Sequence, residues 1–172
     1  MKTLNRFLLL ICLIAVGFSS TSCLKDDSLI DWSKLGVVIE LPYKNHYLRA
    51  TKVTPVKNIS FDFMVNYTVS YDSDNTEDIP VTIVKDASMI DAYNASLGTS
   101  GTYIELPEST YKLPSPVIAK GTRLYKTTIE INTATLSAGK KYIIPIKITG
   151  VPQGYTISGN FGHVYLRVDM AN

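Results

Sequence analysis

Apolar and polar residues alternate along much of the chain, and this pattern predicts a protein built mainly of β-strands. The clearest stretch is 59–71, where apolar or aromatic residues fill the odd positions and mostly polar residues the even ones. A period of two places one face of a strand in a core and the other towards solvent. Shorter stretches with strand character predict further strands at 37–41, 79–85, 103–106, 111–113, 125–131, 142–148 and 164–170.

Residues 87–97 break the β pattern, because their apolar side chains recur at helical spacing. Asp86 can cap a helix there and Gly98 can end it, so we expect one short helix near this position. The segment 43–57 has no regular pattern and is expected to be irregular. The acidic segment 72–78 is expected to be a solvated turn that leads into a return strand.

Leu136, Gly139 and Tyr142 have the spacing Leu-x-x-Gly-x-x-Tyr directly before a predicted strand. This spacing resembles the tyrosine corner of immunoglobulin-like sandwiches, in which the phenol hydroxyl bonds back to the corner's backbone. Together with the turn signals between short strands, it predicts an all-β, immunoglobulin- or fibronectin-III-like β-sandwich of about seven or eight strands. Pro145 lacks the N–H that a central strand needs, so we expect a bulge there or an unpaired side of the strand.

The first 22 residues have the three parts of an export signal. Lys2 and Arg6 precede the apolar run 7–16, which is shorter than the roughly 20 residues that span a bilayer. Small and polar residues then lead into Cys23, a pattern that resembles the relaxed lipobox of Bacteroidota lipoproteins. The resemblance implies cleavage before Cys23, acylation of its thiol and a lipid anchor in the membrane. The alternative is an ordinary secretory signal with an incidental cysteine.

Lys25, Asp26 and Asp27 follow the cysteine directly. They are similar to the signal that sends Bacteroidota lipoproteins to the outer face of the outer membrane, which implies a protein exposed at the cell surface. The alternative is that these residues form a charged, solvated tether and carry no sorting signal. We therefore expect a signal peptide at 1–22, an acylated cysteine and tether at 23–34, and a β-sandwich domain at 35–172.

The balance of charge changes once the signal is removed. The chain has 17 Lys and Arg against 15 Asp and Glu, and two of the basic residues are Lys2 and Arg6 of the signal. The remaining domain is formally neutral, so it has no electrostatic basis for binding nucleic acid. The two cysteines are Cys12 in the signal and Cys23 at the anchor. We therefore expect no disulfide, thiol nucleophile or cysteine-based metal site, and apolar burial must stabilise the fold.

No pattern of catalytic or metal-binding residues stands out in the sequence. His46 and His163 are the only histidines, and neither lies in a Gly-x-Ser-x-Gly or His-Glu-x-x-His motif. Glu105 and Glu108 could pair as carboxylates, but solvation on a loop is the favoured interpretation. The segment 72–78 lacks the central glycine and the distal glutamate of an EF-hand calcium loop. We expect a protein without catalytic residues, metal or cofactor.

Four elements occur in an order that resembles the domain of unknown function 1735 family of Bacteroidota surface lipoproteins. They are a short helix with Tyr93-Asn94, the Leu-Pro-x-Ser-x-Tyr motif at 106–111, the turn Ala119-Lys120-Gly121, and Tyr-x-x-Pro at 142–145. The resemblance covers roughly residues 35–150. It implies an immunoglobulin-like sandwich, usually N-terminal in lipoproteins encoded near glycan-utilisation genes and often followed by a lectin-like or glycoside-hydrolase domain. Because the sequence ends at Asn172, directly after the last predicted strand, we expect no such second domain.

Two non-catalytic functions remain open at this point. The first is a glycan-binding accessory component of a polysaccharide-utilisation system, with Trp32, Tyr47 and Tyr155 as candidate contacts because they lie outside the alternating core-facing sets. The second is a structural or adhesive sandwich that docks another protein, such as a surface lipoprotein, through an exposed strand edge. An aromatic pair on one flat face would favour the glycan, and a long unprotected edge would favour the protein partner.

Overall fold

The computed structural model describes residues 36–50, 58–69, 74–98 and 102–172, except for the side chains of Tyr47, Arg49 and Ala50. The predicted lipidation site Cys23, the export signal Lys25, Asp26 and Asp27, and the candidate contact Trp32 lie outside the described residues. They stay predictions. Within the described part, no helix combines the length and the apolar character that a membrane crossing needs.

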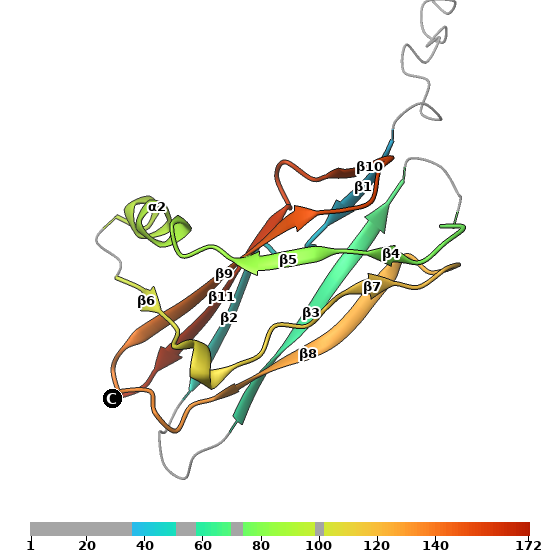
Figure 1. The fold of residues 1–172 in the computed structure, drawn as a ribbon. Coiled ribbons are helices and arrows are strands. Elements are labelled where there is room, and N and C mark those ends of the chain that lie inside the picture. The colour runs from blue at the N-terminus through green and yellow to red at the C-terminus, as the bar shows by residue number, and fades with distance from the viewer. Residues whose placement is uncertain (1–35, 51–57, 70–73, 99–101) are drawn as a thin grey trace, which may run out of the picture. The chain divides into compact units, whose positions relative to one another are not determined.

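The described residues form an all-β sandwich with one short α-helix (Figure 1), which confirms the predicted fold class. The helix is α2 (Met89–Ser96), and a 3₁₀ turn, η2, spans Glu108–Thr110. The strands are β1 (Val37–Glu40), β2 (Asn45–Ala50), β3 (Asn58–Thr68), β4 (Ile79–Pro80), β5 (Thr82–Lys85), β6 (Ile104–Glu105), β7 (Val117–Ile118), β8 (Leu124–Asn132), β9 (Lys141–Gly150), β10 (Tyr155–Ile157) and β11 (His163–Met170).

Two sheets form the layers of the sandwich. One has the strand order β10-β1-β3-β8 and the other β2-β11-β9-β5, with β6 also paired to β9, while β4 and β7 pair separately. The start of the chain contributes to both sheets, because β1 runs antiparallel to β3 and β2 runs parallel to β11. The residues between them, 41–44, therefore cross from one layer to the other.

The core lies between the sheets and follows the alternation seen in the sequence. In β3 the odd-numbered side chains from Phe61 to Tyr67 are buried and Phe61 and Val65 are fully so, which confirms the long amphipathic strand. The facing core residues of β9 and β11 are Tyr142, Ile144, Ile146, Ile148, Val164, Leu166, Val168 and Met170. Each fully buried Ile, Leu or Phe side chain stabilises the fold by about 1.5–3 kcal/mol. This core explains how the domain folds without a disulfide.

The tyrosine corner is formed as predicted. The Tyr142 hydroxyl accepts a hydrogen bond from the backbone N–H of Ser137 at 3.0 Å, and the ring is only 6% exposed. Gly139 sits in the corner at φ +68°, a left-handed conformation that costs little for glycine alone. Its N–H donates to the C=O of Ala171 at 3.2 Å, which ties the corner to the end of the last strand.

Pro145 lies in β9, between strands on both sides. On one side it lies opposite Tyr165 of β11 without a break in register. On the other side β5 pairs with the C-terminal half of β9 and β6 with the N-terminal half, and the Pro145 C=O between them accepts the N–H of Asp86 at 3.0 Å. Because the N–H and C=O of one residue point to the same side of a strand, the missing N–H faces the gap between β5 and β6. The expected unpaired side is therefore confirmed, while the irregularity in register lies at Thr82 and Ile83.

Two expectations about strand partners are wrong. The segment 79–85 does not return onto the long strand, because β5 pairs with β9 in the other sheet and β4 pairs with β7. The segment 43–57 is not wholly irregular, because β2 forms within it. Alternation reveals which face of a strand is buried but not which strand lies beside it. β2 has few β-branched residues, and its pairing partner β11 is about 120 residues further along the chain.

The helix and the acidic turn give one confirmation and two corrections. The helix begins at Met89 with Ser88 as its N-cap, so the cap expected at Asp86 is wrong. α2 ends at Ser96, and Gly98 shortly after it has a φ of +60° and stops the helix as expected.

The prediction that the acidic segment 72–78 is a solvated turn is wrong for Asn75, which is only 4% exposed. Its Nδ2 donates to the C=O of Ala119 at 3.0 Å, and its Oδ1 accepts the N–H of Thr122 at 2.9 Å. A buried amide needs such partners, so Asn75 fixes the turn before β8.

Candidate functional site

A groove of about 490 Å³ runs beside β8. Small-molecule sites in proteins have volumes of roughly 300–1,000 Å³, so the groove is large enough for a ligand. Its walls are the segment between η2 and β7 on one side and β8 on the other, seen in Figure 1 as a yellow trace passing an orange strand. The lining residues are Lys112, Leu113, Pro114, Ser115, Tyr125, Thr128 and Glu130.

Two prolines explain why the groove stays open. The segment after η2 touches β8 through a single bridge, between Tyr111 and Ile131. Beyond that bridge the segment contains Pro114 and Pro116, which have no N–H to continue a ladder. The segment then leaves to pair with β4 as β7. β8 therefore ends its sheet as an edge strand beside a segment that cannot pair with it.

The backbone of β8 supplies polar groups to this groove. The N–H of Tyr67 donates to the C=O of Arg123 at 2.8 Å, so the odd-numbered residues of β8 direct their backbone groups towards β3. Successive residues of a strand point their N–H and C=O to opposite sides. The even-numbered residues from Leu124 to Thr128 therefore direct N–H donors and C=O acceptors towards the free edge of β8, where Thr128 lines the groove.

The side chains add an apolar and an ionic part to the groove. Tyr125 is half-buried and gives the groove an aromatic surface, and Leu113 and Pro114 are half-buried beside it. At the other end, the register of the bridge places Lys112 opposite Glu130, and both are exposed. The site thus offers a cation, a carboxylate and hydroxyl groups next to an aromatic ring.

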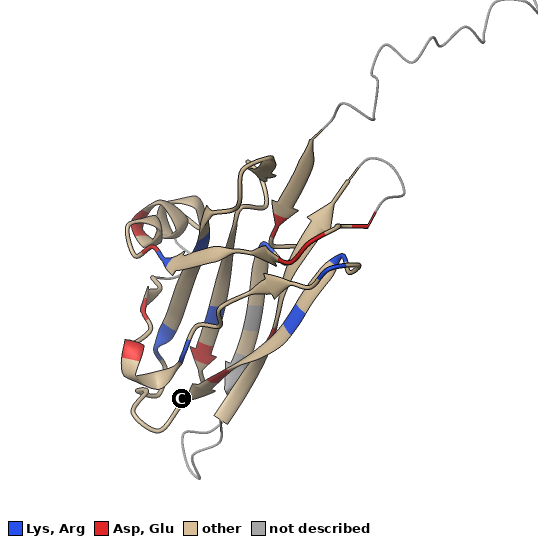
Figure 2. Cartoon of the chain, turned by 45° about the vertical axis from the view of Figure 1, so that its right-hand side comes forward, with Lys and Arg blue, Asp and Glu red and all other residues tan. Residues whose placement is uncertain are grey.

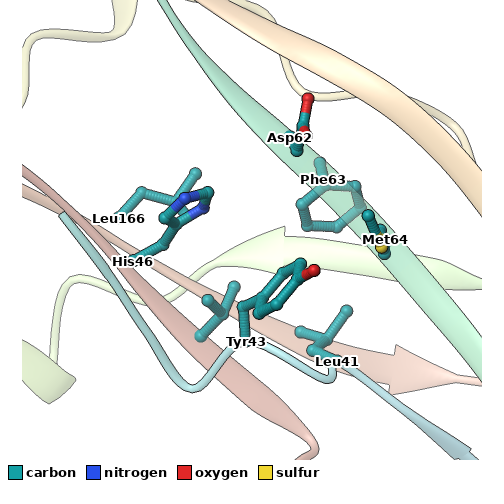
Figure 3. Close-up of a pocket in the computed structure, with 8 residues that line it drawn as sticks. Leu41, Tyr43, His46, Asp62, Phe63, Met64 and Leu166 are labelled. Atoms are coloured by element: carbon teal, nitrogen blue, oxygen red, sulfur yellow. The ribbon is translucent and has the colours of Figure 1, made fainter. Parts of the chain in front are cut away.

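A second hollow lies under Tyr43, on the side where the chain crosses between the sheets (Figure 3). Tyr43 is 46% exposed, and its ring lies 5.5 Å from that of His46. The floor is apolar and includes Leu41, Phe63 and Leu166. Its volume of about 10 Å³ is the space that one water needs, so a sugar ring does not fit inside it.

The aromatic side chains on the outer face of the β2-β11-β9-β5 sheet are mainly a packing cluster. Tyr93 of α2 lies 4.4 Å from Tyr165 of β11 and 5.8 Å from Tyr103, measured between ring centroids. The Nη1 of Arg167 donates to the Tyr93 hydroxyl at 2.9 Å. Burial, followed by the nearby Asp169 carboxylate, raises the pKa of Tyr103 to about 12. Because Tyr93 and Tyr103 are 7% and 6% exposed, the cluster holds α2 on the sheet.

The charged residues of the described strands are mixed in sign, as Figure 2 shows. Glu105 and Glu108 do not form a carboxylate pair, because both make ion pairs with Lys85. The two carboxylates raise the pKa of Lys85, and Lys85 lowers the pKa of Glu108. No group of three or more potential metal ligands occurs among the described residues.

Of the predicted ligand contacts, Tyr155 does not line the groove. Tyr155 is half-buried in β10, its ring 6.5 Å from that of Tyr67, and its hydroxyl donates to Glu77 Oε1 at 3.5 Å. Tyr47 lies in β2, where its backbone is opposite Arg167. The structure describes no side chain for Tyr47, so its predicted contact to a ligand remains a prediction.

No motif in the sequence marks the residues of the groove as functional. Alternation along 125–131 puts Tyr125 on the same face of its strand as Ile129 and Ile131. The sequence feature that could have indicated the groove is the pair Pro114 and Pro116. Two prolines at this spacing cannot donate hydrogen bonds to an adjacent strand, so the edge of that strand stays unpaired. Which strand would lie beside them was not visible from the sequence.

A family model that describes an N-terminal domain matches residues 37–154, more than half of the chain. Among solved structures, a Bacteroides ovatus multidomain protein that includes DUF1735 has a TM-score of 0.54 at 18% identity, covering 77% of this chain and 44% of that protein. The chain belongs to this DUF1735-like family, as the sequence resemblance indicated. None of the curated proteins matches the chain.

Two further structures share the fold. A candidate carbohydrate-binding protein from Bacteroides ovatus has a TM-score of 0.61 at 19% identity and covers 78% of this chain. The Bacteroides thetaiotamicron EndoBT-3987, solved with a Man5GlcNAc product, has a TM-score of 0.52 at 15% identity and covers 77%. The chain spans only 37% and 30% of these two proteins. At such identities the likeness establishes the fold alone.

Proposed function

We propose that the chain is a non-catalytic, lipid-anchored cell-surface protein that binds glycans in the groove beside β8, as an accessory component of a polysaccharide-utilisation system. The observation that carries this proposal is the groove itself, which joins a volume of about 490 Å³ to an aromatic ring and polar groups. Sugars match both parts of the groove. The apolar C–H surface of a sugar ring can lie against the aromatic ring, and the hydroxyl groups around it can bond to the polar groups.

The chemistry of the groove favours an uncharged glycan. A hydroxyl group both donates and accepts, so it can bond to Glu130, to Lys112 and to the backbone groups of β8. Lys112 and Glu130 lie opposite each other. A cationic ligand would therefore be repelled by Lys112, and an anionic ligand would be repelled by Glu130. The C–H face of a sugar ring would lie against Tyr125, Leu113 and Pro114.

Two further lines support the glycan proposal. The fold is shared with a candidate carbohydrate-binding protein and with a protein solved with a Man5GlcNAc product. The expected anchor at Cys23 and the signal Lys25–Asp27 would hold many copies at the outer surface of the outer membrane. Copies on one surface bind a repeating polysaccharide together, so weak individual contacts give useful avidity.

The test is a glycan array followed by calorimetry with the glycans that bind. Ser115 is exposed on the groove wall, so Ser115→Tyr should fill the groove without disturbing the core. We expect this variant to bind about tenfold more weakly or not at all, equivalent to about 1.4 kcal/mol or more. Thr156→Tyr, an exposed position on β10, is the matched control and should bind like the parent. Equal binding by both variants would place the glycan elsewhere.

The free edge of β8 supports a second candidate function. An extended segment of another protein could pair with the even-numbered backbone groups of β8 and add a strand to the sheet. This is the structural or adhesive role that the sequence left open. If no glycan binds on the array, this docking role becomes the better account of the same groove.

A further inference from the structure

A second polar patch lies on the other sheet, away from the groove. His163 of β11 and Lys147 of β9 are cross-strand partners there. The backbone of Lys44 lies next to Tyr165, two residues further along β11, since its C=O accepts the N–H of Tyr165 at 2.9 Å. We call Lys44, Lys147, His163 and Tyr165 the cationic patch.

Positive charge is concentrated in the cationic patch. Burial, and then the charges of Lys44 and Lys147, hold the pKa of His163 below its ordinary value of about 6.5. Asp86 is a carboxylate beside the patch, with its Oδ2 3.9 Å from the Nζ of Lys147. Within the described part of the chain, no ion pair of this kind involves Lys44, so the patch keeps a positive surplus.

Aromatic rings form a rigid wall next to these charges. The His163 ring meets the Tyr165 ring edge-on with centroids 5.3 Å apart, and Tyr165 in turn packs 4.4 Å from Tyr93 of α2. Burial raises the pKa of the Tyr165 phenol, as do the nearby Tyr93 and Asp86, so the hydroxyl stays protonated and can donate. Because α2 fixes these rings, a ligand would meet a preorganised surface.

We propose that the cationic patch binds an acidic sugar unit, with the sugar's carboxylate or sulfate at Lys44 and Lys147 and its ring beside His163 and Tyr165. Protonated His163 adds a third positive charge and an N–H donor, and a bound anion stabilises that protonated form. Binding is therefore strongest below the pKa of His163 in the free protein and weakens as the pH rises through the pKa in the complex. The proposal does not depend on the groove, so either site can fail without the other.

The experiment compares tetragalacturonate with the uncharged galactose tetrasaccharide of equal length. Calorimetry on the purified full-length chain at pH 5.5 and 7.5 measures affinity, and the His163 Cε1–H resonance reports its protonation. We expect the acidic sugar to bind at least about threefold more tightly at pH 5.5, and to raise the pKa of His163. The neutral sugar should leave the His163 resonance unchanged.

Two variants and a control separate the patch from general charge attraction. Lys147→Ala should weaken binding about two- to fivefold, as expected for a partly exposed ion pair. His163→Gln should remove the pH dependence while retaining part of the affinity at pH 7.5. Lys120→Ala, an exposed cation in the turn before β8, should bind like the parent. Equal binding of the neutral sugar, an affinity independent of pH, or equal losses for Lys147→Ala and Lys120→Ala would each overturn the proposal.

Discussion

Replacing Tyr142 by Phe tests whether the tyrosine corner stabilises the sandwich. The change removes one hydroxyl and leaves the ring in place, where it is 6% exposed in the core. The lost interaction is the 3.0 Å bond from the Ser137 N–H, which is partly buried. Leaving such a donor without its partner costs about 1–3 kcal/mol, and partial access of water puts the expected loss at about 1–2 kcal/mol.

This loss is large enough to measure by thermal or urea unfolding. For a domain of this size each 1 kcal/mol lowers the melting temperature by about 2–4 °C, so we expect a decrease of about 2–8 °C. Tyr43→Phe is the control, because Tyr43 is 46% exposed and its hydroxyl leaves the surface without disturbing the core. If the two variants unfold at the same midpoint, the Tyr142 hydroxyl does not hold the corner and the reasoning is refuted.

Further predictions concern the lipid anchor at Cys23, the surface-export signal Lys25–Asp27, the buried phenol of Tyr103 and the buried amide of Asn75. Cys23→Ala should abolish labelling by a palmitate analogue and release the protein from membranes, and labelling that persists would exclude the lipoprotein. Changing Lys25–Asp27 to alanine should protect the domain from protease added to intact cells, whereas equal cleavage would remove the surface signal. Tyr103 should ionise near pH 12 by tyrosinate absorbance; its raised pKa contributes stability that is complete below about pH 10 and is lost as the pH rises to about 12, and ionisation near 10 would contradict its burial. Asn75→Ala should lower the free energy of unfolding by about 1–3 kcal/mol in urea, since it removes the part-buried bonds from the side chain to the backbone of Glu77, Ala119 and Thr122, and an unchanged midpoint would show that the turn needs no such bonds.

Local patterns in the sequence predicted most of the fold because they report burial and backbone geometry directly. Phe61 and Val65 mark a buried face through alternation, and both are fully buried. Gly139 and Tyr142 mark a corner through their spacing, and the corner is formed. Such patterns depend only on residues that are close in the sequence. Burial and turns can therefore be predicted from them without knowing which distant segments pack together.

Contacts between distant segments could not be predicted in the same way. Asn75 lies in a stretch whose composition indicates a solvated turn, yet its amide is buried against residues more than forty positions away. β2 becomes a strand because β11 pairs with it, and nothing in its own sequence indicates that partner. The candidate groove has the same origin, because it requires Pro114 and Pro116 to lie beside one particular edge strand.

Amide chemical-shift mapping with an array-positive glycan tests the central claim most directly. The account predicts that the largest shifts fall on the amides of Leu124, Lys126 and Thr128 and on Lys112 and Ser115 across the groove. The same amides should also exchange more slowly with solvent when the glycan is bound, because sugar hydroxyl groups then accept their hydrogen bonds. Shifts confined to other strands or loops, with the β8 amides unchanged, would contradict glycan binding in this groove.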